Sequence, residues 1–163
     1  MASDFSFDIV SDFDRQELVN AVDQTHREMQ QRYDLKSTNS TLELERDSIV
    51  ITAASDMTLE AIVDVLGSKM IRRGLDLKIL DRQKVENASG SMVRQAINLK
   101  RGIAQDLAKT ITKQIRDGAP KAKSQIQGDA IRVTSKSKDE LQTIMNQVRE
   151  ANYDVPLQFQ NYR

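Results

Sequence analysis

The sequence of 163 residues lacks several residue types on which enzymes and secreted proteins often depend. It has no cysteine, which excludes disulfides, thiol chemistry and cysteine metal sites and favours a reducing compartment. It has a single histidine, so we expect no zinc or iron centre, because such centres usually need several imidazoles or thiolates. Tryptophan is absent, and aromatic residues make up only 4% of the chain.

Long hydrophobic segments are also missing. No apolar run approaches the ~20 residues that span a bilayer. The acidic start, MASDFSFDIVSDFD, has no basic segment of the kind that opens a signal peptide. We therefore expect a cytoplasmic globular protein that does not bind membranes, and its length suits one medium domain or two small ones.

The charges are unevenly distributed, although the formal net charge is zero. Residues 1–87 hold 11 basic and 17 acidic side chains, a net charge of −6. Residues 88–163 hold 13 basic and 7 acidic side chains, a net charge of +6. The division lies near the midpoint of the chain, so this asymmetry between the halves needs an explanation.

Hydrophobic periodicity predicts the same order of elements in both halves. In the first half we expect a strand over 5–10, a helix from Asp14 to about residue 35, and strands near 42–44 and 49–51. Next we expect a helix over 59–70, a left-handed cap at Gly74 and a strand over 75–79. Residues 85–91 are expected to form a linker. In the second half we expect a strand over 93–99, a helix ending at Gly118, a hairpin turn at 128–129, a helix capped by Ser137 and a strand over 157–159.

An offset of 82 residues superimposes the two halves. It sends the turn at 46–47 to 128–129, Ile49 to Ile131 and the helix cap Ser55 to Ser137. The sequence therefore predicts an α+β duplication of two ferredoxin-like β-α-β-β-α-β units, over residues 1–87 and 88–163. Each unit would be a four-stranded antiparallel sheet with two helices on one face.

Three segments resemble one known family. The stretch 121–136, KAKSQIQGDAIRVTSK, with KDELQ at 138–142, resembles a signature of the YajQ family of bacterial nucleotide-binding proteins, and so do SFDIVS at 6–11 and LQFQNYR at 157–163. The resemblance covers the whole chain. It implies a bacterial cytoplasmic protein of two ferredoxin-like domains, whose first strands can be exchanged, that binds a nucleotide. In part of the family it implies binding of cyclic di-GMP with effects on transcription, and it brings no catalytic residues and no cofactor.

Strand alternation gathers cations and amides on the open face of the second sheet, away from the helices. Lysine and arginine can bind phosphate oxygens, while glutamine can pair with base edges or ribose. We predict a site for cyclic di-GMP, GTP or ATP on this face. Its residues are Lys121, Lys123, Arg132 and Lys136 for phosphate, and Gln125 and Gln127 for base or ribose.

Other interpretations of these residues stay open. Lysines on an edge strand commonly block edge-to-edge pairing, and a polar open face is usual for an antiparallel sheet. The first half's acidic face could instead dock on a basic surface, within the chain or in a homodimer. If the first strands are exchanged, Asp8 moves to the basic sheet and Arg94 and Lys100 to the acidic one. We expect this exchange to weaken the charge contrast without erasing it.

The sequence also bears on two further classes of function, RNA binding and catalysis. RNA-recognition modules of this topology stack bases on aromatic rings of the central strands, and no ring is expected there. The second hypothesis is therefore an RNA-binding or protein-binding adaptor, for example of a transcription regulator, that uses the same cations without a small ligand. An enzyme is not expected, because His26 fits a helix surface and the chain has no glycine-rich phosphate loop.

Overall fold

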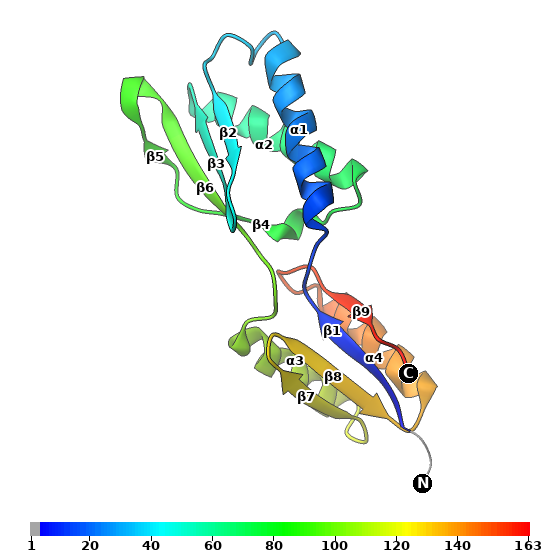
Figure 1. Ribbon diagram of the computed structural model, residues 1–163. Helices are drawn as coiled ribbons and strands as arrows, with labels where there is room; N and C mark the ends of the chain where they lie inside the picture. Colours follow the sequence, from blue (N-terminus) through cyan, green and yellow to red (C-terminus); the bar gives the residue numbers. More distant parts are fainter. Residues whose placement is uncertain (1–3) are drawn as a thin grey trace. The chain divides into compact units, whose positions relative to one another are not determined.

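Two antiparallel sheets organise the chain in the computed structural model, which describes residues 4–163 (Figure 1). The chain divides into two compact units. The central unit contains Phe13–Lys100, and the terminal unit contains the residues up to Asp12 together with Arg101–Arg163. The fold is α+β with four α-helices and two antiparallel sheets in the described residues, which confirms the predicted duplicated ferredoxin-like class.

The central unit packs two helices on one face of a sheet. Its strands follow the order β2-β3-β6-β4, and the short β5 also pairs with β6. The elements are α1 (Arg15–Gln31), β2 (Thr41–Leu44), β3 (Ser48–Ala53), α2 (Asp56–Arg72), η1 (Leu77–Ile79), β4 (Leu80–Arg82), β5 (Glu86–Asn87), η2 (Ser89–Ser91) and β6 (Val93–Leu99).

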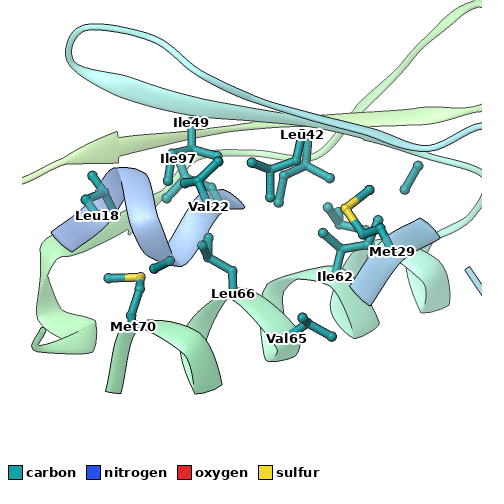
Figure 2. Close-up of a cluster of buried hydrophobic side chains, with 14 of the residues drawn as sticks. Leu18, Val22, Met29, Leu42, Ile49, Ile62, Val65, Leu66, Met70 and Ile97 are labelled. Carbon is teal, nitrogen blue, oxygen red and sulfur yellow. The ribbon is translucent and has the colours of Figure 1, made fainter. Parts of the chain in front are cut away.

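The core of the central unit lies between these helices and the sheet. Leu18 and Val22 of α1 and Leu66 of α2 meet Ile49 and Ile97 of the central strands (Figure 2), and all five are almost fully buried. Burying side chains of this size contributes roughly 1.5–3 kcal/mol each. The apolar residues of α1 recur every three or four positions, so its buried stripe faces the sheet.

Capping residues set the ends of these helices. The Asp14 side chain accepts a hydrogen bond from the backbone N–H of Gln16 at 2.9 Å, and that of Ser55 accepts one from Thr58 at 3.1 Å. Gly74 follows α2 with a φ of +77°, a conformation that glycine adopts without strain. The predicted caps at Asp14 and Gly74 therefore lie where the helices begin and end.

The terminal unit has the same layers, with strand order β7-β8-β1-β9. Phe7, Ile9, Ile111, Ile131 and Ile144 form the centre of its core. Its elements are β1 (Phe5–Val10), α3 (Gln105–Gly118), β7 (Lys123–Gln127), β8 (Ala130–Ser135), α4 (Lys138–Ala151) and β9 (Gln158–Gln160).

The first strands of the two sequence repeats are exchanged. Strand β1 lies between β8 and β9, and β6 lies between β3 and β4. Each repeat therefore contributes one of the two inner strands of the other repeat's sheet. The compact units differ for this reason from the expected division into residues 1–87 and 88–163.

Local structure differs from the prediction at several places in the central unit. The strand expected over 75–79 is wrong, because residues 77–79 form the 3-10 helix η1 and β4 begins at Leu80. The Asp76 carboxylate accepts the N–H of Lys78 at 2.8 Å, which favours a turn over extended chain. The expected linker over 85–91 contains β5 and η2, and α1 ends at Gln31 rather than near residue 35.

Candidate functional site

The predicted site residues lie on and beside the hairpin of β7 and β8. Lys123 and Gln125 lie opposite Thr134 and Arg132, in antiparallel register. Because Ile131 and Val133 point into the core, Arg132 and Thr134 point to the open face. Four of the six predicted residues lie on these strands, and Lys121 and Lys136 lie just outside them. We use the name basic strand pair for the hairpin together with these six residues: Lys121, Lys123, Gln125, Gln127, Arg132 and Lys136.

One end of the basic strand pair borders a pocket of about 370 Å³. Lys121, Lys123 and Lys136 line this pocket together with Thr134. Three of the six predicted residues are thus brought together, beside a hydroxyl group. Ammonium and hydroxyl groups are suitable donors for phosphate oxygens, so this pocket can hold an anionic group.

Serines and a glutamate complete the pocket on the side of α4. The Ser135 hydroxyl donates to Glu140 Oε1 at 2.7 Å and accepts the N–H of Ser137 at 3.0 Å. Ser137 in turn caps α4 by accepting the N–H of Glu140 at 3.2 Å. These bonds hold the Glu140 carboxylate against Ser135. Asp4 adds a second carboxylate to the lining, so the pocket holds two acidic groups as well as three lysines.

Gln125 and Gln127 do not line the pocket. They lie farther along β7, exposed, on the same face of the strand as Lys123. The prediction brought phosphate-binding and base-binding groups into one cluster. The structure instead places the lysines around the pocket and the amides in a row that leads away from it.

Arg132 is paired with an acid that sequence reasoning did not include in the site. Its Nε donates to Asp8 Oδ1 at 2.9 Å and its Nη2 to Asp8 Oδ2 at 3.3 Å. Asn161 Nδ2 donates to the same carboxylate at 2.8 Å. The hydrogen bond from Arg132 lowers the pKa of Asp8 below its usual value, and Asp8 raises the pKa of Arg132.

The strand exchange explains why Asp8 was missed. Asp8 belongs to the acidic repeat in sequence, yet β1 places it directly opposite Arg132 of β8 and Gln160 of β9. In the sequence, only the possibility of strand exchange could have indicated that Asp8 lies beside Arg132. The exchange also removes Arg94 from the predicted basic face, since β6 places it opposite Thr52 and Glu86 in the central sheet.

Exchange also changes the charge balance. The central unit contains 13 basic and 14 acidic side chains, and the terminal unit 11 and 10, so their net charges are −1 and +1. The contrast of −6 and +6 between sequence halves is almost erased, whereas we expected it only to weaken. The cause is the transfer of Asp4, Asp8 and Asp12 in one direction and of Arg94 and Lys100 in the other. Lys121, Lys123 and Lys136 therefore form a local cluster and are not part of a basic domain.

Side chains of the types that bind metals or transfer protons have other surroundings in this structure. Among residues 4–163, no three histidine, cysteine, aspartate or glutamate side chains gather in a way that could hold a metal ion. His26 Nε2 donates to the carbonyl oxygen of Leu42 at 2.6 Å, so this imidazole bridges α1 and β2. No helix in the described range combines the length and hydrophobicity that crossing a bilayer requires.

Comparison with known proteins identifies the family. The model of the family described as "Nucleotide-binding protein YajQ-like" matches residues 5–163. The chain belongs to this family. Relatives named "Nucleotide-binding protein" from Synechococcus sp. (strain JA-2-3B'a(2-13)) and Trichodesmium erythraeum are 58% and 56% identical to it, over the full length of both chains in each pair. The YajQ-like assignment agrees with the resemblance of the segments at 6–11, 121–142 and 157–163.

Proposed function

We propose that this protein is a non-catalytic nucleotide-binding protein, a receptor or adaptor for a guanine nucleotide or dinucleotide such as cyclic di-GMP. The observation that carries the proposal is the gathering of Lys121, Lys123 and Lys136 around one pocket with Thr134. The family description and the names of the relatives support nucleotide binding in general. In this proposal the protein acts in the cytoplasm. Its nucleotide-bound form would interact with RNA or with a transcription regulator.

In the proposed complex, the phosphate lies in the pocket and the base lies along β7. The three lysines neutralise phosphate charge, and the Thr134 hydroxyl donates a hydrogen bond. Gln125 and Gln127 point out along the same strand, where their amides can pair with the donors and acceptors of guanine or with ribose. Because Asp8 accepts the Nε–H and one Nη2–H of Arg132, this residue can reach phosphate only through its remaining N–H groups, two on Nη1 and one on Nη2.

Titration calorimetry of the pure protein with cyclic di-GMP, GTP, ATP and a short RNA tests the proposal. We expect saturable binding of a guanine nucleotide at moderate salt, with weaker binding of ATP. The absence of saturable nucleotide binding would overturn the proposal. Tight RNA binding whose affinity falls steeply with salt would favour the second hypothesis, an adaptor that uses these cations on a nucleic-acid backbone.

A double variant tests the site itself. Lys123→Gln with Lys136→Gln removes two pocket charges that form no ion pair among residues 4–163. We expect affinity for the nucleotide to fall by at least tenfold, which corresponds to about 1.4 kcal/mol. The matched control is Lys109→Gln with Lys113→Gln, two exposed lysines of α3 in the same unit. Equal losses in both variants would show that the pocket is not the site.

A further inference from the structure

A second charged pocket lies in the central unit and is lined by residues of α1 and of the end of α2. Figure 1 labels both helices. Its volume is about 600 Å³, larger than that of the pocket beside β7. Two of its lining residues are glutamines and the other six are charged. The charged residues are Glu17, Arg27 and Glu28 from α1 and, at the end of α2, Lys69, Arg72 and Arg73.

Two of the four cations in this pocket are held by carboxylates. Lys69 Nζ lies 3.0 Å from Glu28 Oε1, and Arg73 Nη1 lies 3.7 Å from Glu17 Oε1. The Lys69 side chain is only 15% exposed, so its ammonium group is fixed close to the helix pair. These two pairs connect α1 to α2 and hold one rim of the pocket in place.

The other two cations have no such partner. Arg27 and Arg72 form no ion pair and no side-chain hydrogen bond within residues 4–163. The pocket therefore carries a net charge of +2, from four cations and two carboxylates. Like charges around one hollow repel each other, and an anion bound between them would relieve that repulsion.

Helix electrostatics account for only part of this arrangement. Lys69 and Arg72 lie in the last turn of α2, where cations offset the negative end of the helix dipole. Arg27 lies well inside α1 and has no such role. Asp23 lies four residues before Arg27, at the spacing of a helical ion pair, yet no bond between them forms. The Arg27 side chain lines the pocket instead.

We propose that this pocket binds a small anion with two or more phosphate groups, through Arg27 and Arg72. Guanidinium groups bind phosphate oxygens in a two-pronged geometry, and the two glutamines add amide donors. The lining contains no aromatic or aliphatic side chain on which a base or an acyl chain could pack. The ligand is thus recognised by its phosphates alone. This site is independent of the one proposed beside β7.

Calorimetry with inorganic tripolyphosphate tests the second site. The full chain carrying Lys123→Gln and Lys136→Gln is used as the starting protein, so that the pocket beside β7 does not contribute. We expect saturable binding to this protein, and at least a tenfold loss when Arg27→Gln and Arg72→Gln are added. The control adds Arg46→Gln and Lys84→Gln, which remove the same charge from exposed positions of the same unit, and should leave binding within twofold.

Three results would overturn the proposal. The first is the absence of saturable tripolyphosphate binding to the starting protein. The second is an equal loss in the control, which would indicate binding to overall charge. The third is binding of a short RNA, but not of tripolyphosphate, that depends on Arg27 and Arg72, because the surface would then contact a nucleic-acid backbone. Circular dichroism of each variant shows whether a loss comes from unfolding.

Discussion

Asp8 is the single residue whose surroundings depend most on the strand exchange. Its side chain is only 12% exposed, on an open sheet face where most polar groups meet water. Arg132 from β8 and Asn161 from the C-terminal segment both donate to it, so three distant parts of the sequence meet at one carboxylate. A buried carboxylate without such donors would be costly, which makes this pairing a specific stabiliser of β1 in its exchanged position.

We predict that Asp8→Asn destabilises the protein by about 1 kcal/mol, because the amide keeps one acceptor oxygen but loses the charge that strengthens the three hydrogen bonds to this side chain. Urea unfolding followed by circular dichroism measures this change. Asp117→Asn, an exposed change near the end of α3, is the control and should not lower stability. If Asp8→Asn were as stable as the original protein, the pairing would contribute nothing to the fold.

The pH dependence of stability should report the same residue. Folding lowers the pKa of Asp8 below its ordinary value of 3.8, chiefly through the hydrogen bond from Arg132. A lowered folded-state pKa means that this stabilisation is complete above the unfolded-state pKa and is lost as the pH falls through the folded-state value. We therefore expect stability to decline more steeply below pH 3.8 in the original protein than in Asp8→Asn. Parallel curves for the two proteins would contradict this assignment.

At the scale of elements, the turn between β6 and α3 is the most constrained. Gly102 has a φ of +81°, and its N–H donates to the carbonyl oxygen of Ser11 at 2.6 Å. A Cβ atom at this position would lie 2.6 Å from Asp129 Oδ2 and 3.1 Å from Asp129 Cβ. Glycine is needed here both for the left-handed backbone and for the close approach of Asp129.

We predict that Gly102→Ala costs more stability than Gly128→Ala in the hairpin between β7 and β8. Both glycines have positive φ, so each substitution should cost about 1 kcal/mol from backbone strain. No atom lies within 4 Å of a Cβ at Gly128, whereas Asp129 must move to accommodate one at Gly102. Thermal unfolding of the two variants measures the difference. A lower midpoint for Gly128→Ala would contradict the prediction.

The elements also show which parts of the fold sequence reasoning could reach. Helix caps and the turn at 128–129 were predictable, because the chemistry of Asp14, Gly74 and Gly128 is local. The strand over 75–79 was wrong because three alternating apolar residues also suit a short turn, and Asp76 favoured the turn. Partners in a sheet were not predictable, because β1 has an equally suitable apolar pattern for either sheet.

The candidate site was partly predictable for the same reason. Alternation along β7 and β8 assigned six side chains to one face, as the register requires. The pocket that gathers three of them also needs the start of α4 and the segment before β1, whose positions depend on tertiary structure. The pairing of Arg132 with Asp8 depends on the exchange, so no local pattern could indicate it.

At the scale of the whole molecule, the exchange determines which fragments can fold. Residues 13–100 contain every strand of the central sheet, whereas residues 88–163 lack β1, the strand between β8 and β9. We predict that the 13–100 fragment unfolds cooperatively in urea and that the 88–163 fragment does not. Cooperative unfolding of the 88–163 fragment would contradict this reading of the sheet.

A rearranged chain provides the matched control. The backbones of Arg163 and Ser6 exchange hydrogen bonds of 3.2 and 3.0 Å, so the C-terminus lies beside the start of β1. A short glycine–serine linker from Arg163 to Asp4, in a protein of residues 101–163 followed by 4–12, should supply the missing strand. Cooperative unfolding is expected to return in that protein. Its failure would indicate that the terminal unit needs more than β1.

The position of β1 also has a consequence for the order in which the protein can assemble during synthesis. Strand β1 leaves the ribosome first, but its neighbours lie at 130–135 and 158–160, near the end of the chain. Contacts over such a sequence separation form slowly, since a long loop must close first. The central unit can fold once residue 100 has emerged. Strand β1 stays unpaired until β8 and β9 have been synthesised. Among the described strands, β1 is therefore synthesised first but completes its pairing only when β9 is available.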